Sequence, residues 1–223
     1  MARQIVIDTS IWAGAVNWQK AKSAGAVAMY TKASQLSADP TFAANWKTAK
    51  DILPRGAFHY LDFHTSELVQ AKLFTDTLAG DWGELPPALD LEQSPALFGL
   101  SPAAVQTKVL NWMNAVEKTT GRVPAIYSGY FYWLQWMTPA TSWVRYPFWL
   151  AWYEPESTIK TPKPWSKWSM WQYTGNGNGP QYGTQGKSLD MSYCDDLPAL
   201  LGAPVPIPTH PTVCPTCGQN WPI

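Results

Sequence analysis

Two carboxylates, Asp90 and Glu92, stand two residues apart at the end of an apolar run, in Pro87-Ala88-Leu89-Asp90-Leu91-Glu92. On a β-strand successive side chains point to opposite faces, so both would project from one face, roughly 6 to 7 Å apart along the strand. Carboxylates this close repel when ionised, which drives the more buried one toward keeping a proton at neutral pH. A proton donor beside an anion is what cleavage of a glycosidic bond requires. The other interpretation is a strand that ends in a solvated acidic turn.

The scaffold for these carboxylates is predicted by the alternation of apolar segments. Short apolar runs alternate with longer amphipathic ones, which is typical of β/α units around a mainly parallel sheet. Eight strands suit a barrel, and we expect them at residues 5–8, 27–32, 56–61, 88–91, 125–128, 148–152, 169–173 and 189–192. Helices are expected at residues 18–24, 40–52, 66–78 and 101–119. The last begins at a Ser-Pro pair and ends before Gly121.

The second half of the chain has a different spacing. Residues 138–193 leave little room for helices and are rich in Pro, Gly and Trp. We therefore expect hairpin-like strands to close the barrel there in place of regular β/α repeats, with a turn in Asn176-Gly177-Asn178-Gly179-Pro180. From residue 202 onward prolines recur every few residues, which favours an extended tail. The predicted organisation is a barrel over residues 1–201 and a Pro-rich tail over residues 202–223.

Composition excludes several classes of protein. The chain has 223 residues, a formal net charge of zero and a pI near 6.8, so nothing attracts it as a whole to nucleic acid or to an anionic membrane. Charged or polar residues interrupt every apolar run, so no membrane insertion is expected. The start reads directly into a strand, without the apolar core of a Sec signal peptide.

Aromatic residues and cysteines bear on the kind of ligand. The 14 Trp and 10 Tyr suit stacking on sugar rings, although most are expected to fill the core. Gly-rich phosphate-binding loops are missing from the sequence. The three cysteines, Cys194, Cys214 and Cys217, are too few and too skewed to the tail for a disulfide framework. Cys214 and Cys217 could be half a zinc site, but only His210 lies nearby. We expect no metal and no cofactor.

Acidic residues recur where the predicted strands end. Asp8 ends the first strand, Asp90 and Glu92 the fourth, Asp190 lies in the last, and Asp62 follows the third. Catalytic groups of β/α barrels collect at the carboxyl ends of the strands, and closure makes the first and last strands neighbours. Taken singly, each acid could be a turn or helix-cap residue. Together they predict an acidic mouth.

The ordered motifs around these acids resemble glycoside hydrolase family 25, the family of bacterial and phage lysozymes. The resemblance covers roughly residues 4–201. In chain order the motifs are Ile7-Asp8-Thr9-Ser10 with Trp12 and Gly14; Tyr30-Thr31-Lys32-Ala33; Asp39-Pro40 with Phe42, Asn45 and Trp46; Gly56-Ala57-Phe58-His59-Tyr60; Leu89-Asp90-Leu91-Glu92; Thr120-Gly121 with Pro124 and Ile126-Tyr127-Ser128; Trp149-Leu150-Ala151 with Tyr153; Trp171-Gln172-Tyr173; and Leu189-Asp190-Met191.

The resemblance implies an α/β fold, an irregular TIM-like barrel of five β/α units closed by three further strands. It implies cleavage of the β-1,4 bond between N-acetylmuramic acid and N-acetylglucosamine in peptidoglycan. The family's catalytic acid falls on Glu92 and its partner on Asp90, with Asp8 and Asp190 flanking them. Glu92 would donate a proton and then activate water, while Asp90 stabilises the oxocarbenium-like state or orients the substrate's acetamido group. The stereochemical course stays open.

Further residues are expected to bind the substrate: Tyr60, Asp62, Tyr127, Trp152 and Gln172. Each could instead be a packing residue. His59 is expected to be a structural histidine within its strand. One departure from the family pattern falls after the second strand, where Ala-Thr-Glu-Gly is usual and this chain has Ala33-Ser34-Gln35-Leu36. The loss of an acid at Gln35 is expected to change one edge of the cleft.

Two rival functions remain open at this point. One is a glycan-binding protein that keeps the barrel without catalysis, and the other is a hydrolase of another amino-sugar polymer such as chitin. The missing Sec signal fits a phage endolysin, made as a monomer in the host cytoplasm, or a virion-associated lysin. The host and the role of the tail cannot be predicted from the sequence.

Overall fold

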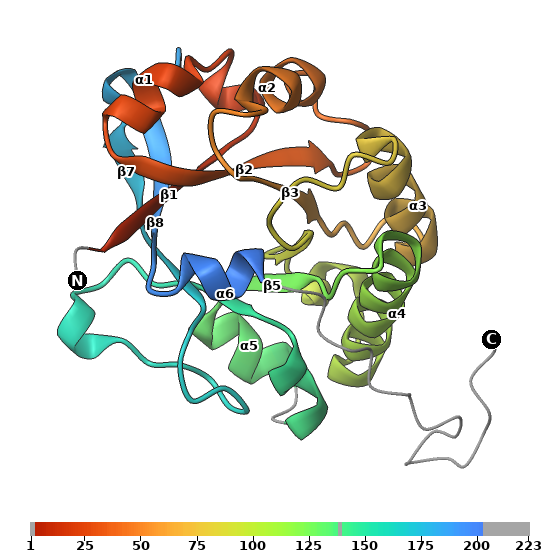
Figure 1. The fold of residues 1–223 in the computed structure, drawn as a ribbon. Coiled ribbons are helices and arrows are strands. Elements are labelled where there is room, and N and C mark those ends of the chain that lie inside the picture. Colours follow the sequence, from red (N-terminus) through yellow and green to blue (C-terminus); the bar gives the residue numbers. More distant parts are fainter. Residues whose placement is uncertain (1–2, 138–139, 203–223) are drawn as a thin grey trace.

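The computed structural model describes residues 3–137 and 140–202 of the chain (Figure 1). In this part of the protein, eight strands form one closed barrel in chain order. The strands are β1 (Gln4–Thr9), β2 (Ala26–Ser34), β3 (Arg55–Tyr60), β4 (Ala88–Leu91), β5 (Ala125–Gly129), β6 (Phe148–Ala151), β7 (Met170–Asn178) and β8 (Ser188–Cys194). The α-helices are α1 (Trp18–Ser23), α2 (Phe42–Ala49), α3 (Glu67–Leu78), α4 (Pro102–Thr120), α5 (Tyr130–Trp136) and α6 (Leu197–Leu201).

The first five strands are each followed by a helix, which confirms five β/α units and three closing strands. Helix α4 begins where its sequence predicts, because the Ser101 hydroxyl accepts a hydrogen bond from the backbone N–H of Ala104, and it ends at the left-handed Gly121. Helix α5 was missing from the expected helices. Between β6 and α6, the segments that connect the strands contain short 3-10 helices and no α-helix.

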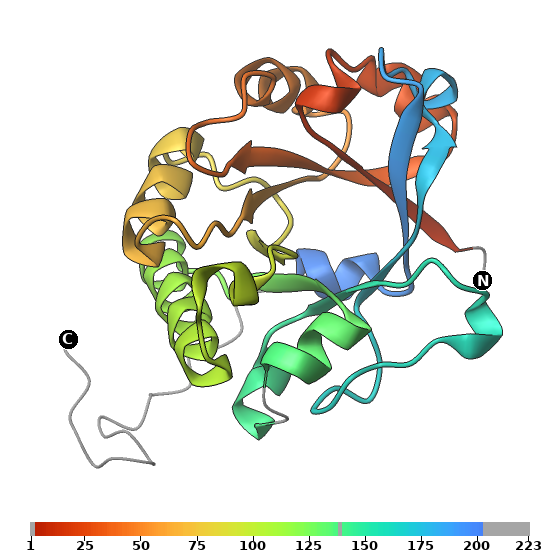
Figure 2. The same cartoon turned by 180° about the vertical axis from the view of Figure 1, so that it is seen from behind.

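The closing strands differ from the expected hairpins. Strand β6 is parallel to β5 and β7, and only β8 runs antiparallel to its neighbours, β7 and β1. The expectation of hairpin-like closure was therefore wrong for β6 and for the step from β6 to β7. Helix α5 returns the chain from β5 to the start of β6, and residues 152–169, without an α-helix, are long enough to return it from β6 to the start of β7. Strand β7 continues through Asn178, so the expected turn begins only at the 3-10 helix η5 (Gly179–Tyr182). This long hairpin reaches α1, where the N–H of Asn17 donates to Gly183 (Figure 2).

Alternate residues of the strands fill the inside of the barrel. Helix α6 closes the amino-terminal end of the barrel with Leu197 and Leu200. The inner apolar cluster contains Val6, Tyr30, Phe58, Ala88, Ala125, Trp149 and Met170. This plug makes the lower barrel a packed core and leaves only its carboxyl-terminal end for a site.

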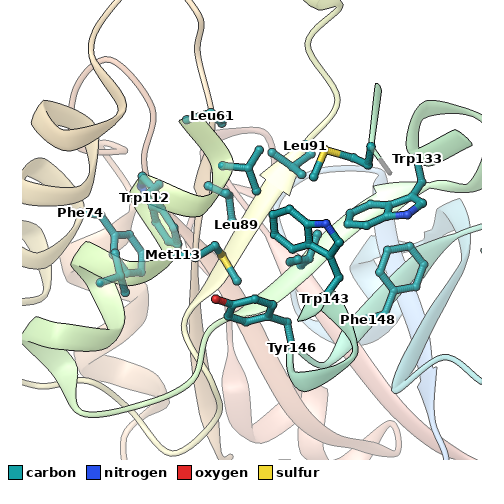
Figure 3. Packing of buried hydrophobic residues seen from close by; sticks show 14 of the residues in the cluster. Leu61, Phe74, Leu89, Leu91, Trp112, Met113, Trp133, Trp143, Tyr146 and Phe148 are labelled. Atoms are coloured by element: carbon teal, nitrogen blue, oxygen red, sulfur yellow. The ribbon is translucent and has the colours of Figure 1, made fainter. Parts of the chain in front are cut away.

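A second core lies between the sheet and the helices of the β3–β6 side. Leu89 and Leu91 of β4 point outward into it, and Trp112 and Met113 of α4 pack from the other side (Figure 3). Helices α3 and α4 lie side by side on this flank (Figure 1). Most tryptophans therefore serve packing, as expected.

The tail with His210, Cys214 and Cys217 lies outside the described residues, so its predicted form is not tested. Cys194 is buried and free at the end of β8. Within the described residues, no helix combines the length and apolar character that crossing a membrane requires.

Candidate active site

The inward-facing rows of the barrel become polar at the carboxyl-terminal end. Six of the seven strand residues in the apolar plug are followed, two positions further along their strand, by a residue at the mouth, because side chains of a strand alternate between faces. Six mouth residues arise in this way: Asp8, Lys32, Tyr60, Asp90, Tyr127 and Gln172. The strands thus carry the polar groups to one place above an apolar floor.

These residues line a cavity of about 330 Å³. Its wall contains the four predicted acids and several aromatic rings. The lining residues are Asp8, Ser10, Trp12, Lys32, Phe58, Tyr60, Asp90, Glu92, Tyr127, Trp149, Tyr153, Gln172 and Asp190. A concave site with polar groups over aromatic surfaces is suited to a sugar.

Asp8 and Asp190 face each other across the closure of the barrel. They are register partners in the antiparallel pair of β1 and β8. Because β8 is antiparallel, Asp190 reaches the mouth from near the amino end of its strand, which corrects the expectation that all four acids lie at carboxyl ends. Burial, and then the charge of Asp190, raise the pKa of Asp8 well above its usual value. Burial, and then Glu92, raise the pKa of Asp190 to about 6.

Asp90 and Glu92 occupy different depths of the cavity. Asp90, within β4, is buried, and its Oδ1 has no hydrogen-bond partner in the described part of the chain. Glu92, just past the end of β4, is exposed at the mouth. Burial and then the nearby Glu92 raise the pKa of Asp90, and the surrounding wall raises the pKa of Glu92 against the opposing effect of the Tyr127 hydroxyl. Burial and mutual repulsion therefore favour a protonated carboxyl in the acidic cluster.

Gln172 connects this cluster to two tyrosines. Its Nε2 donates to Asp8 Oδ2 at 3.0 Å, and its Oε1 accepts from the hydroxyl of Tyr127 at 2.6 Å and from that of Tyr153. Because both ends of the amide are engaged, its orientation is fixed. The hydrogen bond to Asp8 favours the ionised form of that acid against the effect of burial.

Two residues expected to bind substrate lie outside the cavity. Trp152 is buried and packs edge-on against Tyr130, so it offers no sugar platform in the cavity. Asp62 is buried beside the mouth, where it accepts hydrogen bonds from Gln35, Gln93 and His64. Tyr60, Tyr127 and Gln172 line the cavity as expected.

Several residues that line the cavity were not among those expected from the sequence. Strand alternation could have found Tyr153, because Trp149 and residue 151 face inward and the next inward position is 153, whereas Trp152 faces outward. The inward direction of Lys32 follows from the same alternation on β2, because Tyr30 faces inward and Lys32 is two residues further on. Trp12, in contrast, comes from the loop after β1 and remains 86% exposed, and no periodicity indicates its position.

His59 is a structural residue, as expected. It is buried, with its ring nitrogens bonded to Ser34 Oγ at 2.8 Å and Gln70 Oε1 at 3.0 Å, and it stacks on Trp112. Burial lowers the pKa of His59 to about 4, which keeps the ring neutral at physiological pH.

A closed β/α barrel whose mouth gathers carboxylates over aromatic rings defines the class of barrel glycoside hydrolases. The chain belongs to Glycosyl hydrolases family 25, whose family model matches residues 7–182. This confirms the resemblance seen in the motifs.

Individual relatives agree with the family. The chain is 32% identical over 186 residues to lysozyme M1 of Streptomyces globisporus, covering 77% of this chain and 62% of that protein. It is 36% identical over 132 residues to the uncharacterized protein YegX of Escherichia coli, covering 55% of this chain and 47% of YegX. The chain thus spans about half the length of YegX and less than two thirds of lysozyme M1.

Solved structures confirm the fold. A bacterial lysozyme from Streptomyces coelicolor superimposes with a TM-score of 0.78 at 27% identity, over 90% of this chain and 96% of that one. A muramidase from Acremonium alcalophilum gives a TM-score of 0.75 at 26% identity, over 89% and 99%. The irregular eight-stranded barrel is therefore that of the family.

Proposed function

We propose that the protein is a lysozyme that hydrolyses the β-1,4 bond between N-acetylmuramic acid and N-acetylglucosamine in bacterial peptidoglycan. The observation that carries the proposal is the pair of carboxyls at two depths of one cavity, buried Asp90 and exposed Glu92. Membership of the family and the similarity to lysozyme M1 support the choice of substrate.

The roles of the two carboxyls follow from their depth. Glu92 stands at the mouth, where a glycosidic oxygen can reach it, and its raised pKa favours a form that carries a proton. That proton passes to the glycosidic oxygen as the bond to C1 breaks, so the leaving sugar departs as an alcohol. Ionised Asp90, two residues earlier and deeper in the cavity, stabilises the positive charge that develops on the sugar ring.

The second half of the reaction restores the enzyme. Glu92, now ionised, takes a proton from water while the water oxygen bonds to C1, directly or after the substrate's acetamido oxygen has held that position. Asp8 and Asp190 place two further carboxyl groups on the opposite side of the mouth. Rings such as Tyr60, Phe58 and the exposed Trp12 provide apolar faces against which the sugar rings stack.

The test is digestion of purified peptidoglycan followed by mass analysis of the fragments. We expect fragments that end in reducing N-acetylmuramic acid, and Glu92→Gln should lower their release by about a thousandfold or more, because the amide cannot donate a catalytic proton. Asp195→Asn, an exposed acid beyond the far end of β8, is the matched control and should keep wild-type activity. Near wild-type release by Glu92→Gln would exclude the proposed role.

The same digestion separates the rival functions. Binding to cell walls without release of fragments would indicate a glycan-binding protein, and faster release from chitin than from peptidoglycan would indicate a different polymer. The phage-driven setting and the monomeric state stay predictions from the sequence.

A further inference from the structure

Lys32 is the cationic side chain among the residues that line the cavity. It extends from β2 two positions after Tyr30, and its ammonium group lies 5.0 Å from the centre of the Tyr60 ring. Its Nζ donates a hydrogen bond to Gln35 Oε1 at 2.8 Å. Tyr60 is the register partner of Asp90 in the parallel pair of β3 and β4, so ring and amide together hold the ammonium group on the Asp90 side of the mouth.

Gln35 presents a neutral acceptor to this lysine. Its Nε2 donates to Asp62 Oδ2 at 3.2 Å, and Asp62 in turn is held by the backbone N–H of His64 at 2.9 Å and by Gln93 Nε2 at 3.2 Å. Because Asp62 engages the amide nitrogen, the amide oxygen is left to face Lys32. The lysine is therefore anchored without its charge being neutralised.

Ion pairs elsewhere in the described chain do not include Lys32. The seven pairs within 4.0 Å between basic and acidic groups leave it out. Its charge acts instead on the mouth carboxyls, where it opposes the effect of burial on the pKa of Asp90 and of Glu92. The buried Asp90 oxygen without a hydrogen-bond partner makes such a charge necessary if Asp90 is to ionise.

The depth of the two carboxyls creates a conflict that this charge resolves. Burial and repulsion favour placing the shared proton on the deeper group, Asp90, whereas the proposed reaction needs it on Glu92. An unneutralised cation beside the deeper carboxyl moves the balance toward ionised Asp90. A carboxylate at position 35 would neutralise that cation and return the balance toward protonated Asp90.

We propose that Lys32 is a positioning residue that favours the ionised form of Asp90 in the mouth of the barrel, and that neutral Gln35 leaves its charge free to do so. The catalytic consequence of this inference rests on the proposed function, whereas the titration of Asp90 can be measured without it. It gives the departure at position 35 a consequence: the working pH range of this enzyme lies lower than it would with an acid there.

Other charged and titratable groups surround these residues, and they do not supply the same effect. Burial raises the pKa of Tyr60 to about 12 and that of Tyr127 well above its usual value, so both rings stay neutral. His59 is neutral as well. The groups near Lys32 or Asp90 are Asp8, His59, Tyr60, Glu92, Tyr127, Tyr132 and Asp190, with Asp62 and its partner His64 behind Gln35. Lys32 is thus the positive charge available to Asp90 among them.

The direct test is a carboxyl ¹³C NMR titration of Asp90 in the full chain, with the resonance assigned from Asp90→Asn. Lys32→Met should raise the titration midpoint of Asp90 by roughly one pH unit, and Gln35→Glu should raise it in the same direction. Lys32→Arg and Gln35→Met keep the positive charge unneutralised, so both should stay near the wild-type midpoint. An unchanged midpoint in Lys32→Met overturns the proposal.

Activity gives a second readout that a purely structural role would not move. The acid limb of the pH profile of kcat/KM requires ionised Asp90 and the alkaline limb requires protonated Glu92, so both limbs should move to higher pH in Lys32→Met and Gln35→Glu. A fall in activity at every pH with both limbs unmoved overturns the proposal. If Lys32→Met does not fold, Gln35→Glu against Gln35→Met decides. Because the titration needs no substrate, absence of peptidoglycan cleavage would reject the proposed function while leaving this inference to be judged on the midpoints.

Discussion

The side-chain amide of Gln172 is engaged on both sides within the mouth of the barrel. Its nitrogen donates a hydrogen bond to Asp8, and its oxygen accepts hydrogen bonds from Tyr127 and Tyr153. We expect Gln172→Glu to lower kcat/KM on peptidoglycan by about tenfold to a hundredfold, because it removes a donor to a charged group and adds a repelling carboxylate. Steady-state kinetics on purified cell walls measure the loss.

Tyr153→Phe is the matched control for that change. It removes one of the two hydroxyls that donate to the amide oxygen and keeps both the ring and the bond from Gln172 to Asp8. Its loss should be several times smaller than that of Gln172→Glu. Equal losses in the two variants would show that the link to Asp8 is not the important one.

At the level of single residues, the sequence predicted which acids meet in the site better than it predicted which way neighbouring side chains point. Asp90 and Glu92 could be placed in one cavity because their spacing of two matches the period of a strand. Trp152 has the chemistry of a sugar platform, but strand alternation puts Tyr153 inside and Trp152 outside. The hydrogen bonds of Asp62 could not be foreseen, because they join three segments that are distant in sequence.

At the level of elements, the short strands and the closure of the barrel were predictable, and the directions of the closing strands were not. Each of the eight expected strands overlaps an observed one, because apolar runs mark the buried sheet. The direction of β6 depends on the crossover through α5, and that of β7 on residues 152–169, which contain no regular helix and leave no periodic signal. Helix α5 was missed because aromatic residues, which have no strong helix preference, make up five of its seven positions, Tyr130–Trp136.

Helix α5 is held by packing. Trp133 is 1% exposed, its Nε1 donates to Lys163 O at 3.0 Å, and its ring meets Trp143, Phe148 and Trp165 (Figure 3). Trp133→Ala should lower the free energy of unfolding by about 3 to 5 kcal/mol through loss of buried contacts and formation of a cavity. Urea unfolding followed by circular dichroism measures it.

The control on the same helix is Leu134→Ala. Leu134 is 55% exposed, so its truncation should change the free energy of unfolding by less than about 1 kcal/mol. A similar loss in both variants would mean that helix propensity, and not the cluster around Trp133, stabilises α5.

Across the whole molecule, the two ends of the barrel respond to pH in opposite directions. At the base, Arg55 at the start of β3 is buried and bonds Asp81 and Glu84, and its hydrogen bonds hold the pKa of both acids below their usual values, against burial at Glu84. Groups with a lowered pKa stabilise the fold above their unfolded pKa, near 4, and that contribution disappears as pH falls further. Acid should therefore destabilise the amino-terminal end of the barrel.

At the mouth the sign is reversed. Asp8, Asp90 and Asp190 have raised pKa values, so the folded state holds protons that the unfolded chain would release, and stability falls as pH rises from about 4 through the folded values. The maximum of stability should lie between these regimes, at mildly acidic pH. The acidic mouth thus lowers the stability of the barrel at neutral pH, as expected where charges are gathered for chemistry.

Asp190→Asn isolates the contribution of the mouth. With a folded pKa of about 6 for Asp190 against an unfolded value near 4, the amide should stabilise the protein by about 2 to 3 kcal/mol at pH 8 and by almost nothing at about pH 3, where the acid is largely neutral in both states. Urea unfolding at the two pH values measures the difference, with Asp195→Asn beyond the other end of β8 as control. An equal effect of Asp190→Asn at both pH values would mean that the aspartate and its asparagine replacement differ in packing and not in charge. The mouth would then carry no electrostatic strain at this position.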